Sequence, residues 1–204
     1  IDMVRDDREH GSRWLVHQTI LILRDLAQQK MDDEDEHMHQ LLTSGRVLAQ
    51  ARPAMAALSA AVGRIFNTTW TPAAIVQAAH QLLQDYDSAI ERIALHAKPY
   101  LSGRIMTCSL SGTILDVFKA HRQQIEHLVV LEGRPRYEGL VMAREFGALG
   151  FDVTLLTDAQ ADIFIPQCDA VVVGADSILA NGDVLNKAGT ALMAWSAYGH
   201  TIPF

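Results

Sequence analysis

Apolar residues in the first hundred positions recur at helical spacing. Between Trp14 and Leu26 they form an approximate helical stripe. The acidic stretch 32–36 indicates a helix start, because negative charge is stabilised at the positive end of the helix dipole. Gly45 predicts a break or a kink, and Thr71–Pro72 places a cap residue before a proline in the first helical position. The pattern predicts helices near 14–26, after 32–36, over Val47–Phe66 and from Pro72 to about Ala97.

From Leu101 onward, short runs rich in β-formers alternate with helical stretches. The predicted strands are Arg104–Cys108, His127–Leu131, Val153–Thr157 and Ala170–Val173. The predicted helices lie near Thr113–Arg122, Tyr137–Leu149, Ala159–Ile163 and Asn186–Tyr198. This alternation predicts an α/β fold with a mostly parallel sheet, in which ligands sit beyond the carboxyl ends of the strands. We therefore expect a helical domain over 1–100 and an α/β domain over 101–204.

Composition restricts the class of protein. Hydrophobic residues make up 49% of the 204 residues, which is enough for a sizeable core. The net charge of -7 argues against a surface that binds nucleic acid, which needs clustered Lys and Arg. The sequence has no run long enough to span a membrane and no signal-peptide pattern at its start. Its two distant cysteines indicate a reducing compartment, so we expect a cytoplasmic protein.

The most informative segment follows the last predicted strand. It runs from Gly174–Ala175–Asp176 through Asn181–Gly182 to Asn186–Lys187. Asp176 follows the strand's carboxyl end, and a helix start that carries a lysine suits an anion such as phosphate. Taken singly, Asp176 reads as a helix cap and Lys187 as a surface charge. Together at one sheet edge they favour a binding site.

Two further polar segments follow predicted strands. Arg134, after the second strand, could contact a phosphate through two hydrogen bonds, or could pair with Glu132 on the surface. Cys108 and Ser109 end the first strand, where they could reach a reacting carbon. The simpler reading there is a helix cap beside a buried thiol.

The helical half offers weaker candidates. Arg52–Pro53 and the turn that contains Gly11 and Ser12 both precede predicted helices, so each could be a helix start alone. His37 and His39 stand beside Glu36 without the spacing that places ligands on one helix face. We expect no metal site there.

These segments together resemble the family that contains the α, β and δ subunits of eukaryotic translation initiation factor 2B. That family also contains methylthioribose-1-phosphate isomerase and ribose-1,5-bisphosphate isomerase. The signature from Gly174 to Asn186–Lys187 is its most specific part, and the Asp176–Ser177 pair looks closest to ribose-1,5-bisphosphate isomerase. The resemblance covers nearly the whole chain. It implies a helical N-terminal domain, a Rossmann-like domain that here ends before its last strand and helix, and dimers or higher homo-oligomers.

The resemblance also implies roles for single residues. Asp176 would be the catalytic carboxylate. The substrate-binding residues would be Gly11, Ser12, Arg52, Arg134, Glu138, Asn186 and Lys187. The isomerases carry a catalytic cysteine in a Thr-His-Cys segment, where this chain reads Thr107–Cys108–Ser109. Ungapped alignment puts Ser109 in the cysteine's place, so either residue could act. Glu138 stands where the isomerases usually carry glutamine.

Two functions follow. The leading hypothesis is an isomerase that converts an aldose 1-phosphate to a ketose 1-phosphate without a cofactor, using Asp176 with Cys108 or Ser109 as acid and base. The rival is a regulatory subunit that binds a sugar phosphate or nucleotide without turnover, as the serine and glutamate departures suggest. No Gly-x-Gly-x-x-Gly follows the first predicted strand, which argues against a dinucleotide enzyme.

Overall fold

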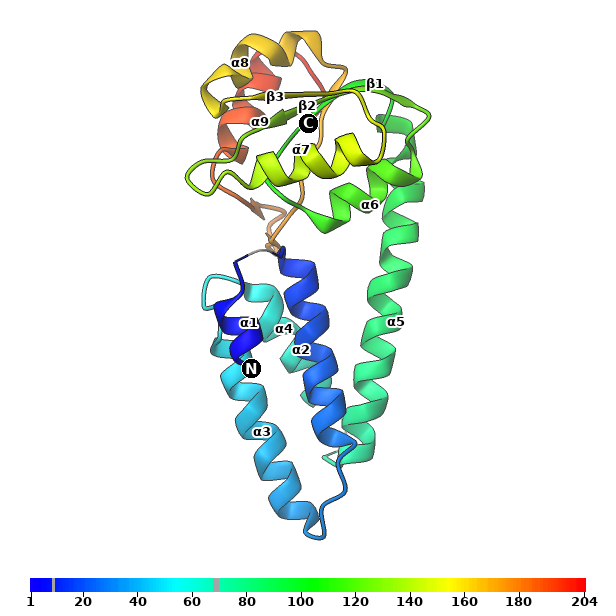
Figure 1. Cartoon of the computed structure of the whole chain (residues 1–204), viewed down its shortest axis with the longest axis vertical. Helices are drawn as coiled ribbons and strands as arrows, with labels where there is room; N and C mark the ends of the chain where they lie inside the picture. The colour runs from blue at the N-terminus through cyan, green and yellow to red at the C-terminus, as the bar shows by residue number, and fades with distance from the viewer. Residues whose placement is uncertain (9, 68–69) are drawn as a thin grey trace. The chain divides into compact units, whose positions relative to one another are not determined.

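The computed structural model describes residues 1–8, 10–67 and 70–204. It divides into two compact units, Ile1–Ala89 and Ile90–Phe204. The boundary lies inside one helix of 26 residues, α5 (Pro72–Ala97). Figure 1 shows the elements of both units. In the part of the chain that is described, no helix is both long enough and apolar enough to cross a bilayer.

The first unit is helical, as the apolar pattern predicts. It contains α1 (Asp2–Asp6), α2 (Ser12–Ala27), α3 (Glu34–Gln50), α4 (Ala56–Phe66) and the first part of α5. Asp33 caps α3, because its side chain accepts the backbone N–H groups of Asp35 and Glu36 at 2.9 and 3.1 Å. The buried core combines α2, α3, α4 and α5 through residues that include Leu15, Ile20, Leu23, Leu41, Leu48, Leu58, Ile65 and Ile75.

The predicted break at Gly45 is wrong. Gly45 lies inside α3, and the chain turns instead between α3 and α4. The ring of Phe66 explains the glycine: a Cβ at position 45 would lie 2.5 Å from its Cε2 atom. Arg52–Pro53 therefore belongs to the connection between two helices and does not open one directly.

The second unit is an α/β layer structure, which confirms the predicted fold class. Its four-stranded parallel sheet has the order β3-β2-β1-β4. The strands are β1 (Gly103–Cys108), β2 (Ile125–Leu131), β3 (Val153–Leu156) and β4 (Ala170–Val171). The helices that follow are α6 (Gly112–Ala120), α7 (Glu138–Ala148), α8 (Ala161–Phe164) and α9 (Thr190–Gly199), with short 3-10 turns at Lys98–Tyr100, Asp158–Gln160 and Ile165–Gln167.

Helices cover both faces of this sheet (Figure 1). On one face, Phe118 of α6 and Phe146 of α7 pack with Ile105 and Leu128 of the central strands. On the other face, α8 and α9 pack on the alternate strand residues, where Met193 and Ala197 of α9 join Met106 and Val129 of the central strands in one buried cluster. Strands buried on both faces explain why these segments read as continuous apolar runs.

The segment after β4 departs from the prediction. An antiparallel pair, β5 (Ser177–Ile178) with β6 (Val184–Leu185), precedes α9, which begins at Thr190 and not at Asn186. Asn181 closes the turn of this hairpin, because its side-chain oxygen accepts the backbone N–H of Asp183 at 3.1 Å. Asn186 and Lys187 therefore lie on the link between hairpin and helix.

Candidate functional site

The sheet brings several predicted site residues to one edge. Cys108 at the end of β1 pairs with Leu131 at the end of β2, and Leu131 pairs with Leu156 at the end of β3. The three loops that follow these strands therefore begin side by side. This edge is the usual ligand-binding edge of a parallel α/β sheet.

The loop after β1 is held in an uncommon backbone conformation. Ser109 has φ 62 and is only 4% exposed. A left-handed residue that is not glycine costs roughly 1–2 kcal/mol, and such residues gather at functional sites. The hydroxyl of Ser109 donates to Oε2 of Glu138 at 3.1 Å. The unusual backbone thus accompanies a specific side-chain contact.

The loop after β2 is fixed by a carboxylate from the loop after β3. Asp158 accepts the backbone N–H groups of Gly133 at 2.9 Å and of Arg134 at 2.7 Å. Asp158 is not among the residues predicted from the sequence. It satisfies the same rule as the other candidates, since it is a polar residue directly beyond a strand end.

The start of α7 is pressed against the end of β2. A Cβ on Gly139 would lie 1.8 Å from the carbonyl oxygen of Leu131, so the position admits glycine alone without a backbone shift. This close approach fixes the backbone next to Glu138. The side chain of Arg134, by contrast, is exposed and lies over the ring of Tyr137, with 4.6 Å from its guanidinium carbon to the ring centroid.

Glu138 and Lys187 form an ion pair across the site. The Lys187 ammonium donates to both carboxylate oxygens, at 2.9 Å to Oε2 and 3.1 Å to Oε1. The side chains are 22% exposed for Glu138 and 41% for Lys187. Ser109, Glu138 and Lys187 are thus three predicted residues, from separate segments, that the structure joins by hydrogen bonds.

Cys108 is a buried thiol next to this cluster. Burial raises its pKa to about 11, a nearby charge on Asp158 adds to the rise, and a hydrogen bond with Thr190 and the charge of Lys187 oppose it. Asn186 donates from Nδ2 to the hydroxyl of the same Thr190 at 2.9 Å. Near pH 7 the Cys108 side chain therefore keeps its proton.

Asp176 lies apart from these hydrogen bonds. It precedes the β5–β6 hairpin, is exposed, and donates its backbone N–H to the carbonyl of Leu185 at 2.9 Å. Within the described residues its carboxylate takes part in no hydrogen bond or ion pair. The structure therefore links Ser109, Glu138 and Lys187 directly, Cys108 and Asn186 through Thr190, and leaves Asp176 open to solvent.

Of the predicted residues of the first unit, two lie at the start of α2 and the third lies in the turn after α3. Gly11 is the cap of α2 and Ser12 its first residue. Arg52 donates through Nε to the carbonyl of Val4 at 3.1 Å and through Nη2 to the carbonyl of Asp7. These bonds tie α1 and the residue that follows it to the turn after α3.

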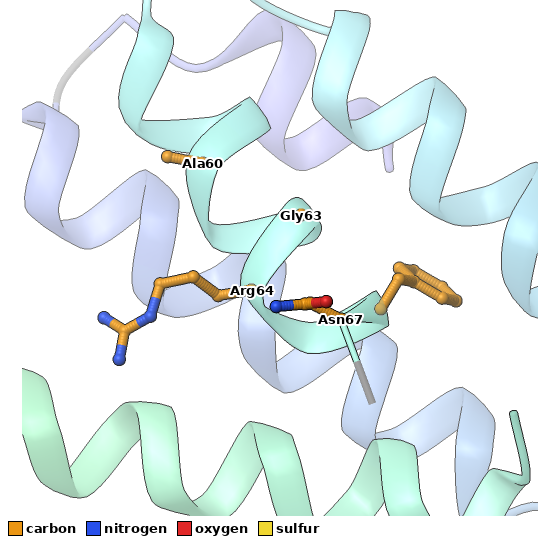
Figure 2. A pocket seen from close by; sticks show the side chains of 5 residues that line it. Ala60, Gly63, Arg64 and Asn67 are labelled. Atoms are coloured by element: carbon orange, nitrogen blue, oxygen red, sulfur yellow. The ribbon is translucent and has the colours of Figure 1, made fainter. Parts of the chain in front are cut away.

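His10, in the segment before α2, is held by Asp7. Its backbone N–H and its ring Nδ1 both lie 2.8 Å from the carboxylate of Asp7, and its ring stacks on Trp14 with centroids 3.9 Å apart. A separate surface hollow of the first unit is lined by Ala60, Gly63, Arg64, Phe66 and Asn67 (Figure 2). The charge of Arg64 is matched by Asp85 at 2.6 Å, and the hollow contains none of the predicted residues.

Comparison with known proteins identifies the family. The model of the initiation factor 2 subunit family matches residues 8–204. The chain belongs to this family. Ribose 1,5-bisphosphate isomerase of Thermococcus kodakarensis is 31% identical over 188 residues, which are 85% of this chain and 58% of that protein. Methylthioribose-1-phosphate isomerase of Serratia proteamaculans is 35% identical over 150 residues, 66% of this chain and 44% of that protein.

A solved structure agrees with the fold. The Pyrococcus horikoshii translation initiation factor eIF-2B is 28% identical, has a TM-score of 0.88, and is matched over 98% of this chain and 74% of that chain. The chain spans about half the length of the curated relatives that it matches first, with 58% and 41% of the two ribose 1,5-bisphosphate isomerases covered. Family and fold are thus established, and both isomerases and initiation-factor-like proteins are among the relatives.

Proposed function

We propose that this protein binds a phosphorylated sugar at the carboxyl edge of its sheet and converts an aldose 1-phosphate to a ketose 1-phosphate. One observation carries the proposal: Cys108 ends β1 at the sheet edge, directly before Ser109, which is hydrogen-bonded to Glu138 and through it to Lys187, and burial raises the pKa of the Cys108 thiol to about 11. The names of the two isomerase relatives support it.

The reaction needs one acid and one base. The C1–O bond of the sugar ring breaks while the thiol of Cys108 gives its proton to the ring oxygen. The hydrogen on C2 moves with its electron pair to C1, and the carboxylate of Asp176 takes the hydroxyl proton of C2, which becomes a carbonyl. Proton exchange with water then restores the thiol and the carboxylate. A thiol with a pKa of about 11 is a suitable donor to a departing alkoxide, which is a stronger base.

The other residues have supporting roles in this proposal. Lys187 and Asn186 hold the oxygens of the substrate, and Arg134 contacts its phosphate. For Arg52 the contacts within the first unit support a positioning role, since its Nε and Nη2 atoms hold the backbone near α1. Ser109 remains the alternative donor, and its hydroxyl is bound to Glu138.

Turnover tests the proposal. Purified protein is incubated with ribose 1,5-bisphosphate or 5-methylthioribose 1-phosphate, and ketose formation is followed. Loss of the proton donor should lower the rate about 100-fold or more in Cys108→Ala, and Asp176→Asn should do the same for the base. Cys168→Ala is the matched control, because Cys168 is also a buried free thiol with a pKa raised to about 11. Full activity in Cys108→Ala would remove this residue from the mechanism.

A non-catalytic regulatory subunit is the second candidate. The ion pair of Lys187 with Glu138 and the exposed carboxylate of Asp176 favour it, because neither is set up for catalysis without rearrangement. The same incubation separates the two: no ketose, together with a rise in melting temperature on adding the sugar phosphate or a nucleotide, supports binding without turnover.

We also propose that the protein forms a homodimer or a higher homo-oligomer in the cytoplasm. Leu192, Trp195 and Tyr198 lie on one face of α9 and are 71, 72 and 79% exposed, and α9 has no charged residue. An uncharged apolar face is compatible with its own copy, because no like charges meet. Light scattering should give a multiple of the chain mass for wild type and for Leu95→Glu, an exposed apolar position elsewhere, and a smaller mass for Trp195→Glu.

A further inference from the structure

The ion pair at the site places a fixed negative charge where a phosphate would need a positive one. The Lys187 ammonium lies within 3.1 Å of both oxygens of Glu138. A phosphate oxygen that contacts this ammonium would lie within about 6 Å of the carboxylate, where two like charges in a partly buried site repel each other strongly. Lys187 in this arrangement offers little net positive charge.

Glu138 cannot easily withdraw from this position. Gly139 is pressed against the carbonyl of Leu131, so the backbone at the start of α7 has no room to retreat. The hydroxyl of Ser109 also holds Oε2 at 3.1 Å. Rotation of the Glu138 side chain would free Lys187 but would break three hydrogen bonds, whereas rotation of the Lys187 side chain would break two and move the ammonium away from the site.

A carboxylate beside an ammonium nevertheless suits a neutral polyhydroxyl group. The carboxylate oxygens accept hydrogen bonds from sugar hydroxyls, and the ammonium donates to the oxygen atoms of the same hydroxyls. We propose that Glu138 is a specificity-determining residue: it excludes a second phosphate from Lys187 and selects sugars that carry one phosphate and present free hydroxyls there. This inference rests on the proposed binding of a sugar phosphate.

Glutamine at this position tests the proposal, since it keeps the shape and removes the charge. Affinities of ribose 1-phosphate and ribose 1,5-bisphosphate are measured by calorimetry on wild type and on Glu138→Gln. Wild type should bind the monophosphate more tightly. The variant should shift the ratio of the two affinities toward the bisphosphate about tenfold. Ser109→Ala, which removes one hydrogen bond from Glu138, should shift the ratio in the same direction by about two- to threefold.

Glu145→Gln is the matched control. Glu145 is an exposed residue of the same helix, so the substitution changes the net charge equally and should leave the ratio unchanged. An unchanged ratio in Glu138→Gln overturns the inference, as does equal weakening of both ligands. If only the proposed isomerase activity is wrong, wild type binds the sugar phosphates but forms no ketose. In that case the ratio of the two affinities still tests the role of Glu138. No binding of either sugar by any variant would overturn both.

Discussion

Two stretches at the same sheet edge carry predicted site residues but are built in different ways. The inner rim, defined here as Ser109, Gly133, Glu138, Gly139 and Asp158, is fixed by hydrogen bonds and close backbone contacts between strand ends. The outer hairpin, residues 176–185, is largely exposed, with Ile178 at 72% and Leu185 at 55%. Rim residues therefore have a part in folding, whereas hairpin residues are free to serve ligand or partner contacts. Substitutions can break or sharpen this difference.

The largest effect is expected at Gly139. In Gly139→Ala the new methyl would lie 1.8 Å from the Leu131 carbonyl oxygen, so α7 must move away from β2. We expect a loss of about 3 kcal/mol or more in the free energy of unfolding, measured by urea denaturation. Gly147→Ala, in the same helix with open space around its Cβ, should instead leave stability unchanged or raise it by up to ~1 kcal/mol. Equal free energies of unfolding for the two variants would contradict the close packing of Gly139 on the carbonyl of Leu131.

The next effect separates the rim from the hairpin directly. Asp158→Ala leaves the backbone N–H groups of Gly133 and Arg134 without their acceptor, which should cost about 2 kcal/mol. Asp183→Ala is the matched change in the hairpin, where an exposed carboxylate accepts from Asn181 at 2.8 Å. For Asp183→Ala, urea denaturation should show a change in the free energy of unfolding of no more than about 0.5 kcal/mol. A larger loss at position 183 would reverse the comparison.

The rim and the hairpin also differ in how well the sequence predicts them. Apolar periodicity locates β1, β2, α6 and α7 to within two residues, because these elements bury a regular face. The start of α9 is misplaced by four residues, since the pattern around 177–187 has no buried face and its structure depends on the cross-strand bonds of a short hairpin. Periodicity carries no information on such an exposed hairpin.

Site residues follow the same division. The rule that polar residues after strand ends lie at one edge of the sheet selects Ser109, Glu138 and Lys187, which the structure joins by hydrogen bonds. The rule does not tell which donor binds which acceptor. The sequence therefore could not predict that Lys187 pairs with Glu138, or that Arg52 donates to backbone carbonyls near α1. Those pairings depend on side-chain conformations and on packing between distant segments.

Alkaline pH provides a smaller test of burial at the rim. Burial raises the pKa of the Cys108 thiol from 9.0 to about 11. The contribution of this thiol to the free energy of unfolding is fully present below pH 9, where it is protonated in both the folded and the unfolded chain. The contribution is lost as the pH rises toward 11, because the unfolded chain then releases the proton while the folded chain still holds it. We expect Cys108→Ala to lessen the fall in stability between pH 9 and 11 by about 1–2 kcal/mol relative to wild type. Identical pH profiles would show that the thiol is not buried.

The smallest effect concerns the left-handed backbone at Ser109. Both Ser109→Ala and Ser109→Gly lose the hydrogen bond to Glu138, but only glycine relieves the positive φ. The glycine variant should therefore be the more stable of the two by about 1 kcal/mol. Ser196 is the matched control, because it lies within α9 and its hydroxyl also donates to a carboxylate, Asp162, at 2.6 Å. In a helix the order reverses, with Ser196→Ala more stable than Ser196→Gly by about 1 kcal/mol. The same order at both positions would mean that the backbone at Ser109 is not strained, and the strongest sign that this loop was shaped for function would be lost.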